Sequence, residues 1–60
     1  MIRIRVFWDN ESEIDTALRV TNAIDSILEG KQKQLGIKRL GIRTTNDPPH
    51  SFGIHLEKAT

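Results

Sequence analysis

The chain has 60 residues, two histidines and no cysteine, which limits what can stabilise it. A domain of this size hides only about 60% of the surface that its unfolded chain exposes, so it is marginally stable alone. Small domains usually gain stability from disulfides, a metal ion or oligomerisation. Without cysteine, disulfides and thiolate metal sites are excluded, and two histidines do not complete a structural zinc site. We therefore expect self-association, with no metal and no cofactor.

The charge of the chain is nearly balanced, with nine Lys and Arg residues, eight Asp and Glu residues and a formal net charge of +1. A nucleic-acid-binding protein normally shows a marked basic excess or a clustered basic face. Here Arg3 and Arg5 form a small pair, and a looser run of basic residues extends from Lys31 to Arg43. This distribution favours a solvated face and a strand edge protected by charge, and makes nucleic acid an unfavoured partner.

Apolar runs in this sequence are short. None approaches the ~20 residues of a membrane span, and no charged start followed by an apolar stretch suggests a signal peptide. The absence of cysteine fits a reducing compartment. The sequence therefore predicts a soluble, cytoplasmic protein with no membrane partner.

The opening stretch IRIRVFW alternates with period two, which indicates a β-strand rich in β-branched residues. One side of this strand carries Ile2, Ile4, Val6 and Trp8, and the other carries Arg3, Arg5 and Phe7. We expect Trp8 to lie in the core with the apolar side. Phe7 interrupts the polar side, which suggests that this side has a partner.

A helix is predicted from Glu13 to Glu29. Asn10 or Ser12 can cap its start, with Glu13 or Asp15 three residues later. Its apolar residues cover about 180° of the helix circumference, wider than the ~100° stripe that one contact needs. One side can cover a sheet, and the excess suggests contact with another subunit. Gly30 is expected to end the helix, because glycine accepts the left-handed conformation.

Two more strands are predicted after the helix. The second runs from Ile37 to Thr45, with a bend or bulge at its glycines, and NDPP ends it. A short third strand falls in SFGIHLEKA. The result is a single α+β domain, residues 1–60, in the order β-α-β-β, with one helix packed on a short sheet. The first two strands suit a right-handed parallel crossover, and the last is expected to form a hairpin or an arm that reaches a neighbour.

Three stretches carry a family resemblance. They are the opening strand MIRIRVFW, the helix core LRVTNAIDSIL and the element IRTTNDPPHSFGI, in which the Pro-Pro-x-x-Phe-Gly-Ile spacing is the most specific part. Together they resemble the 4-oxalocrotonate tautomerase family, whose short subunits are β-α-β units with a C-terminal hairpin. The resemblance implies a tautomerase-like oligomer, such as dimers stacked into a hexamer.

The resemblance also implies an active site between subunits. In that family an N-terminal proline is the catalytic base, and an apolar pocket lowers the pKa of its amine toward neutrality. This chain begins with Met1 and Ile2, so the α-amine of Met1 would have to replace the proline. Phe52 takes the place of the family's aromatic wall.

The arginines that would bind a substrate carboxylate are displaced from the family's positions. The position after the first strand falls near Asn10 and Glu11, which lack a positive charge. The position in the second strand falls on Gly41, and Arg43 and Arg39 lie two residues away on either side. Because residues two apart share a face of a strand, either arginine is a candidate for two-pronged carboxylate binding.

Two hypotheses about function follow. The first is a divergent tautomerase subunit that isomerises a small unsaturated keto acid, or a non-catalytic subunit in a mixed oligomer with a related, proline-bearing chain. The second is a non-enzymatic oligomeric binding or assembly module, since the sequence shows no Ser/His/Asp grouping, metal-ligand spacing or glycine-rich phosphate loop. His50 and His55 are interpreted as exposed loop and strand residues.

Overall fold

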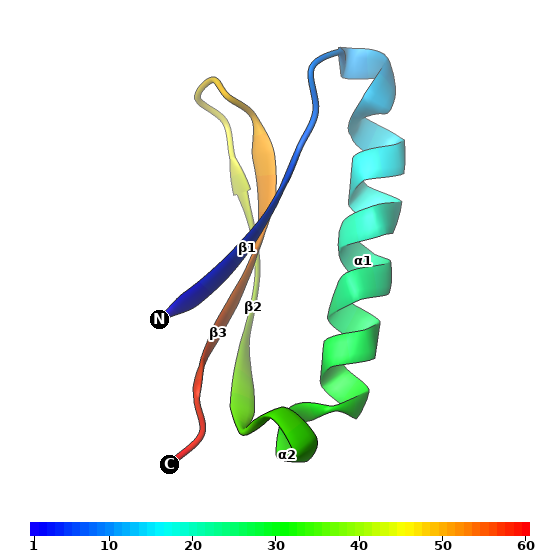
Figure 1. Ribbon diagram of the computed structural model, residues 1–60. Helices are drawn as coiled ribbons and strands as arrows, with labels where there is room; N and C mark the ends of the chain where they lie inside the picture. The colour runs from blue at the N-terminus through cyan, green and yellow to red at the C-terminus, as the bar shows by residue number, and fades with distance from the viewer.

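Three strands form one sheet, and a long helix lies against one face of it (Figure 1). The computed structural model describes residues 1–60. The elements are β1 (Ile2–Phe7), the 3-10 turn η1 (Glu11–Glu13), α1 (Ile14–Gly30), α2 (Gln32–Leu35), β2 (Ile37–Thr45) and β3 (Ser51–Lys58). The predicted α+β class, the β-α-β-β order and the bounds of the second strand are confirmed.

The third strand in the sequence is the central strand of the sheet, whose order is β1-β3-β2. β3 pairs in antiparallel fashion with both neighbours, so β1 and β2 run parallel to each other without pairing. The expected crossover therefore places β2 one strand away from β1, with β3 between them. β2 and β3 form the predicted hairpin, and β3 is not an arm that extends to a neighbour.

The predicted capping arrangement at Asn10 and Glu13 lies at the start of η1, the turn that leads directly into α1. The Glu13 carboxylate accepts the backbone N–H groups of Asn10 at 3.0 Å and Asp9 at 3.1 Å. These two hydrogen bonds lower the pKa of Glu13, and the one from Asn10 has the larger effect. The carboxylate thus satisfies two exposed donors ahead of the helix, as a capping box requires.

Helix α1 ends at Gly30, as predicted, but Gly30 does not adopt the left-handed conformation on which that prediction was based. Gly30 is the last residue of α1, the chain breaks direction at Lys31, and the short helix α2 follows. The left-handed residue is Gly36, with φ +66°, and its N–H donates to the Lys33 carbonyl at 3.3 Å. Just after α1, the Lys31 N–H donates to the Leu28 carbonyl at 3.1 Å.

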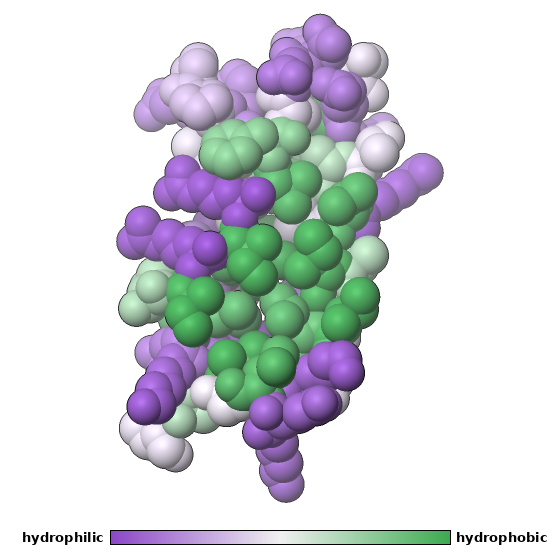
Figure 2. Space-filling model, in the orientation of Figure 1, coloured by the Kyte–Doolittle hydropathy of each residue, from purple (hydrophilic) through white to green (hydrophobic).

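The core is small and lies between α1 and one face of the sheet. Only seven of the 60 residues are buried, and the apolar ones are Ala17, Phe52, Ile54 and Leu56. Thr21 is fully buried as well, and its hydroxyl donates to the Ala17 carbonyl at 2.8 Å. Such a core leaves much of the apolar surface of the helix uncovered, and Figure 2 shows a continuous hydrophobic patch where β1 meets α1.

A bulge interrupts β2 between Arg39 and Gly41. Arg39 lies opposite Leu56 and Gly41 opposite His55, so Leu40 is the extra residue. Gly41 has φ +125°, a conformation that a residue with a side chain rarely adopts. The irregularity expected near the glycines of this strand is confirmed at Gly41.

An ion pair between Arg39 and Asp25 joins β2 to α1. Arg39 Nε donates to Asp25 Oδ1 at 3.0 Å, a second hydrogen bond joins Nη2 to Oδ2, and Glu29 lies 3.8 Å from Nη1. The side chains of Arg39 and Asp25 are 26% and 13% exposed. The hydrogen bond with Asp25 raises the pKa of Arg39. Because the pair is two-pronged and partly shielded from water, we expect it to stabilise the packing of α1 on the sheet.

Replacement of Asp25 by Asn tests the contribution of this ion pair. The amide keeps the size of the side chain but removes the charge and one acceptor oxygen, so the Arg39 guanidinium loses its two-pronged partner and keeps only the longer contact with Glu29. We expect a melting temperature lower by several degrees. The control is Lys38→Gln, which removes the exposed 4.0 Å contact with Glu57 and should change the melting temperature little. Equal effects of the two variants would contradict the assignment.

Candidate functional site

The residues that the family resemblance singles out lie at opposite ends of the sheet. Met1 precedes β1 and is 74% exposed, beside the end where Ile2 pairs with Leu56. Phe52 pairs with Val6, near the other end of the same strand. Within one chain the α-amine of Met1 and the Phe52 ring are therefore not brought together.

Phe52 belongs to an aromatic cluster at the end of the sheet near the Pro48-Pro49 loop. It is 7% exposed, and its ring centroid lies 4.7 Å from that of Trp8 at a tilt of 35°. Trp8 also stacks on His50, with centroids 5.8 Å apart and planes within 12°. Trp8 thus lies on the core side of β1, as predicted. The side chain that resembles the family's wall mainly fills the core.

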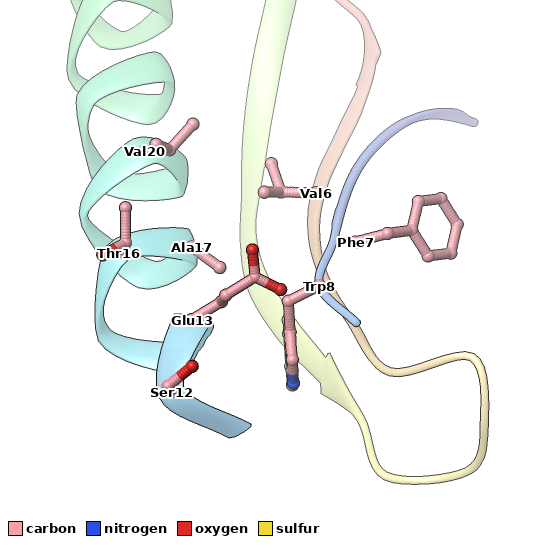
Figure 3. Close-up of a pocket in the computed structure, with 8 residues that line it drawn as sticks. All are labelled: Val6, Phe7, Trp8, Ser12, Glu13, Thr16, Ala17 and Val20. Carbon is pink, nitrogen blue, oxygen red and sulfur yellow. The ribbon is translucent and has the colours of Figure 1, made fainter. Parts of the chain in front are cut away.

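Two pockets adjoin this cluster. One, of about 350 Å³, is lined by Trp8, Glu11, Ile14, Thr44, Thr45, Asn46, His50 and Phe52. The other, of about 300 Å³, lies between β1 and α1; Figure 3 shows Val6, Ala17 and Val20 on its walls, while Phe7 points away on the far side of β1. Glu13 reaches into this second pocket, but backbone N–H groups already occupy its carboxylate. Neither pocket contains an arginine.

The two candidate carboxylate-binding arginines lie on opposite faces of the sheet, which corrects the expectation that they share one. Arg39 points toward α1, where Asp25 holds its guanidinium. Arg43 lies opposite Gly53, on the face away from the helix. In a regular strand, residues four apart share a face; the extra residue at Leu40 shifts the alternation by one and separates the two arginines.

The uncovered face of the sheet gathers basic residues from two strands. Residues that pair across strands point to the same side of a sheet, so the register shows which side chains meet. Arg5 and Arg43 flank Gly53 in one row, and Arg3 lies beside His55 in the next. We call Arg3, Arg5, Arg43, His55 and Phe7 the open face. Its three arginines take no part in the ion pairs of the structure, which are Lys38–Glu57, Arg39–Asp25 and Arg39–Glu29.

His55 lies half-buried at the centre of this face. Burial lowers its pKa below the usual 6.5, and the positive charges of Arg43, Arg3 and Arg5 lower it further. Gly53 provides room for the imidazole, because a Cβ at this position would lie 3.2 Å from His55 Nε2. The imidazole of His55, which lies against the buried Gly53, therefore forms the centre of the open face between the arginines.

The sequence did not reveal this grouping. The alternation of IRIRVF places Arg3, Arg5 and Phe7 on one side of β1, but nothing local indicates that Arg43 and His55 join them. That requires the strand order and the position of the bulge, both of which depend on contacts between distant segments.

Comparison with known proteins adds no relative to this picture: no family model, curated protein or solved structure matches the chain. Neither α1 nor α2 combines the length and apolar character of a membrane-spanning helix. No group of three or more His, Asp or Glu side chains is placed to hold a metal ion. The candidate site therefore rests on the geometry described here.

The lowered pKa of His55 predicts a pH dependence of stability. The unfolded chain, in which His55 has its usual pKa near 6.5, binds the proton more readily than the folded one. The contribution of neutral His55 to the free energy of unfolding is therefore complete above pH 6.5. It is lost as the pH falls from there through the folded-state pKa. We expect urea midpoints to fall between about pH 7 and about pH 5.

A His55→Asn variant should show a smaller fall over the same pH range. The charged residues around His55 on the open face are Arg3 and Arg5 on β1, Arg43 on β2, and the pair of Glu57 and Lys38. The pKa of Glu13 is lowered from 4.5, so the titration of Glu13 affects stability only below the pH range of this test. An unchanged pH dependence in the variant would contradict the assignment to His55.

Proposed function

We propose that this protein is a non-enzymatic binding module that self-associates through the free edge of β1. The observation that carries the proposal is a partly exposed apolar strip along that edge. The strip consists of the exposed Ile2, Val20 and Ile27 and the half-buried Ile4, Val6 and Ile24.

β1 is the less protected of the two sheet edges. It pairs with β3 on one side only and runs for six residues without proline or bulge. Both edge strands carry charged side chains, but only β2 contains a bulge. A bulge discourages pairing at a sheet edge. A second strand is therefore expected to add to β1 rather than to β2.

The helix extends the apolar surface beside this edge. Val20 lines a pocket together with Val6, and Ile24 and Ile27, four and seven residues further along α1, lie on the same side of the helix. Ile2, Val20 and Ile27 are 47%, 44% and 60% exposed. In a chain with so small a core, covering these side chains would supply stabilisation that the monomer lacks.

A second copy of the chain fits this strip. Two β1 strands paired in antiparallel fashion about a two-fold axis would place their apolar sides on the same face of a six-stranded sheet. Both helices would then cover that face, with their exposed flanks toward each other. The arginine sides would form the opposite face.

Replacement of Ile27 by Lys tests the interface. The side chain is largely exposed in one chain, so a charge there should leave the fold intact but disrupt a contact with a second copy. We expect light scattering to give a dimer mass for the native protein and a monomer mass for Ile27→Lys.

The matched control is Leu18→Lys, which changes a 39% exposed apolar residue of the same helix. Leu18 precedes Val20 by two residues and points about 200° around the helix from it, away from the strip. This variant should remain dimeric. A monomeric native protein at high concentration, or a dimer that Ile27→Lys does not weaken, would refute the proposal.

A divergent tautomerase-like subunit is the second candidate. The β-α-β-β order and the place of Phe52 in the wall of the 350 Å³ pocket favour it. In this alternative, an oligomer brings the Met1 amine of one chain to the pocket of another, or a proline-bearing partner supplies the base to a small unsaturated keto acid.

Enolisation assays separate the two candidates. The tautomerase alternative predicts that the oligomer converts phenylenolpyruvate or 2-hydroxymuconate, and that chemical blocking of the α-amine abolishes the conversion. The binding module predicts no conversion above the buffer rate by absorbance.

A further inference from the structure

We propose that the open face of the sheet binds single-stranded nucleic acid, with arginines on the phosphates and Phe7 under a base. The inference goes beyond the proposed self-association, because one chain presents the whole face and β1 edge pairing does not cover it. It departs from the expectation drawn from net charge, since the fold separates charges that the sequence mixes.

Charge separation is the first support. Of the eight acidic residues, Glu57 lies on the open side of β3, and the other seven lie before α1, in α1 or in the β2–β3 loop. Glu57 is 4.0 Å from Lys38, so it has a cation of its own. Arg3, Arg5 and Arg43 are left without an acidic partner. A surface with this excess attracts a polyanion even though the whole chain is nearly neutral.

The spacing of the arginines suits a chain of phosphates. Arg3 and Arg5 are two residues apart on β1, about 7 Å along the strand. Arg5 and Arg43 stand on either side of β3, about 10 Å apart by two strand spacings. Between them the imidazole of His55 lies against Gly53, so no long side chain separates the two arginines.

Phe7 indicates which polyanion the face would take. It follows Arg3 and Arg5 on the same side of β1, is 55% exposed, and points away from the core and the pocket in Figure 3. An exposed aromatic ring on a basic sheet face is a stacking platform for an unpaired base. A duplex keeps its bases stacked inside, and an acidic peptide has no flat ring to stack. A second copy would bring arginine against arginine.

Fluorescence anisotropy with a labelled oligothymidylate of about 12 nucleotides tests the inference. Three phosphate contacts per chain predict a slope of log affinity against log salt near −2, so that binding weakens about 20-fold between about 50 and about 200 mM salt. Failure to bind at low salt would overturn the proposal.

Three variants divide the binding into its parts. Arg43→Gln should weaken binding and reduce the salt slope by about 0.7, because one phosphate contact is lost. Phe7→Leu keeps an apolar side chain but removes the ring, and should weaken binding about five-fold or more with the salt slope unchanged. The matched control is Arg19→Gln, which makes the same charge change on the exposed side of α1 and should alter neither quantity.

The outcomes that would refute the proposal are distinct. If Arg19→Gln weakens binding as much as Arg43→Gln, the attraction is general and not located on the open face. If an acidic peptide of equal charge binds as tightly as the oligonucleotide, or Phe7→Leu has no effect, the stacking role is wrong. Circular dichroism of each variant verifies the fold, and light scattering in the same buffer records whether self-association is intact.

Discussion

The central position of β3 is the constraint on which the other features depend. This strand is paired on both edges, and its Phe52, Ile54 and Leu56 lie under α1, with Ile54 fully buried. Burial of these three side chains is the main source of apolar stabilisation in so small a chain. Because β3 occupies the centre, β1 and β2 both become edge strands, and each edge has to be protected by its own means.

The two edges differ in how they are protected. β2 has a bulge at Leu40 and is connected to α1 through Arg39 and Asp25. β1 has neither feature, and its apolar side continues into the exposed flank of α1. This asymmetry is the physical basis for proposing assembly at one edge only, which gives a closed dimer; two equally open edges would favour chain-like association.

The bulge has a second consequence, for the distribution of charge. It directs Arg39 to the helix side, where the guanidinium has a structural partner, and leaves Arg43 on the open side with Arg3 and Arg5. One inserted residue thus divides the basic residues of β2 between a structural and a solvent-facing role. The proposed assembly and the proposed nucleic-acid binding use different surfaces of the sheet, its edge and its open face, so both can operate in the same particle.

The sequence by itself determined the elements and their local chemistry. Each of three features is encoded in a short stretch of sequence: the alternation in IRIRVF, the capping pair of Asn10 and Glu13, and the bounds of β2. The structure has all three where the patterns indicate. Gly30 shows the limit of such reasoning, because α1 ends there as the pattern indicates, yet the left-handed glycine is Gly36, after the short helix α2. The tertiary structure alone decided that β3 lies in the centre, that Arg39 and Arg43 face opposite ways, and that His55 lies among three arginines. Those features depend on hydrogen bonds between strands far apart in the chain, and the register of such bonds is set by packing of the whole sheet under α1 rather than by any local pattern.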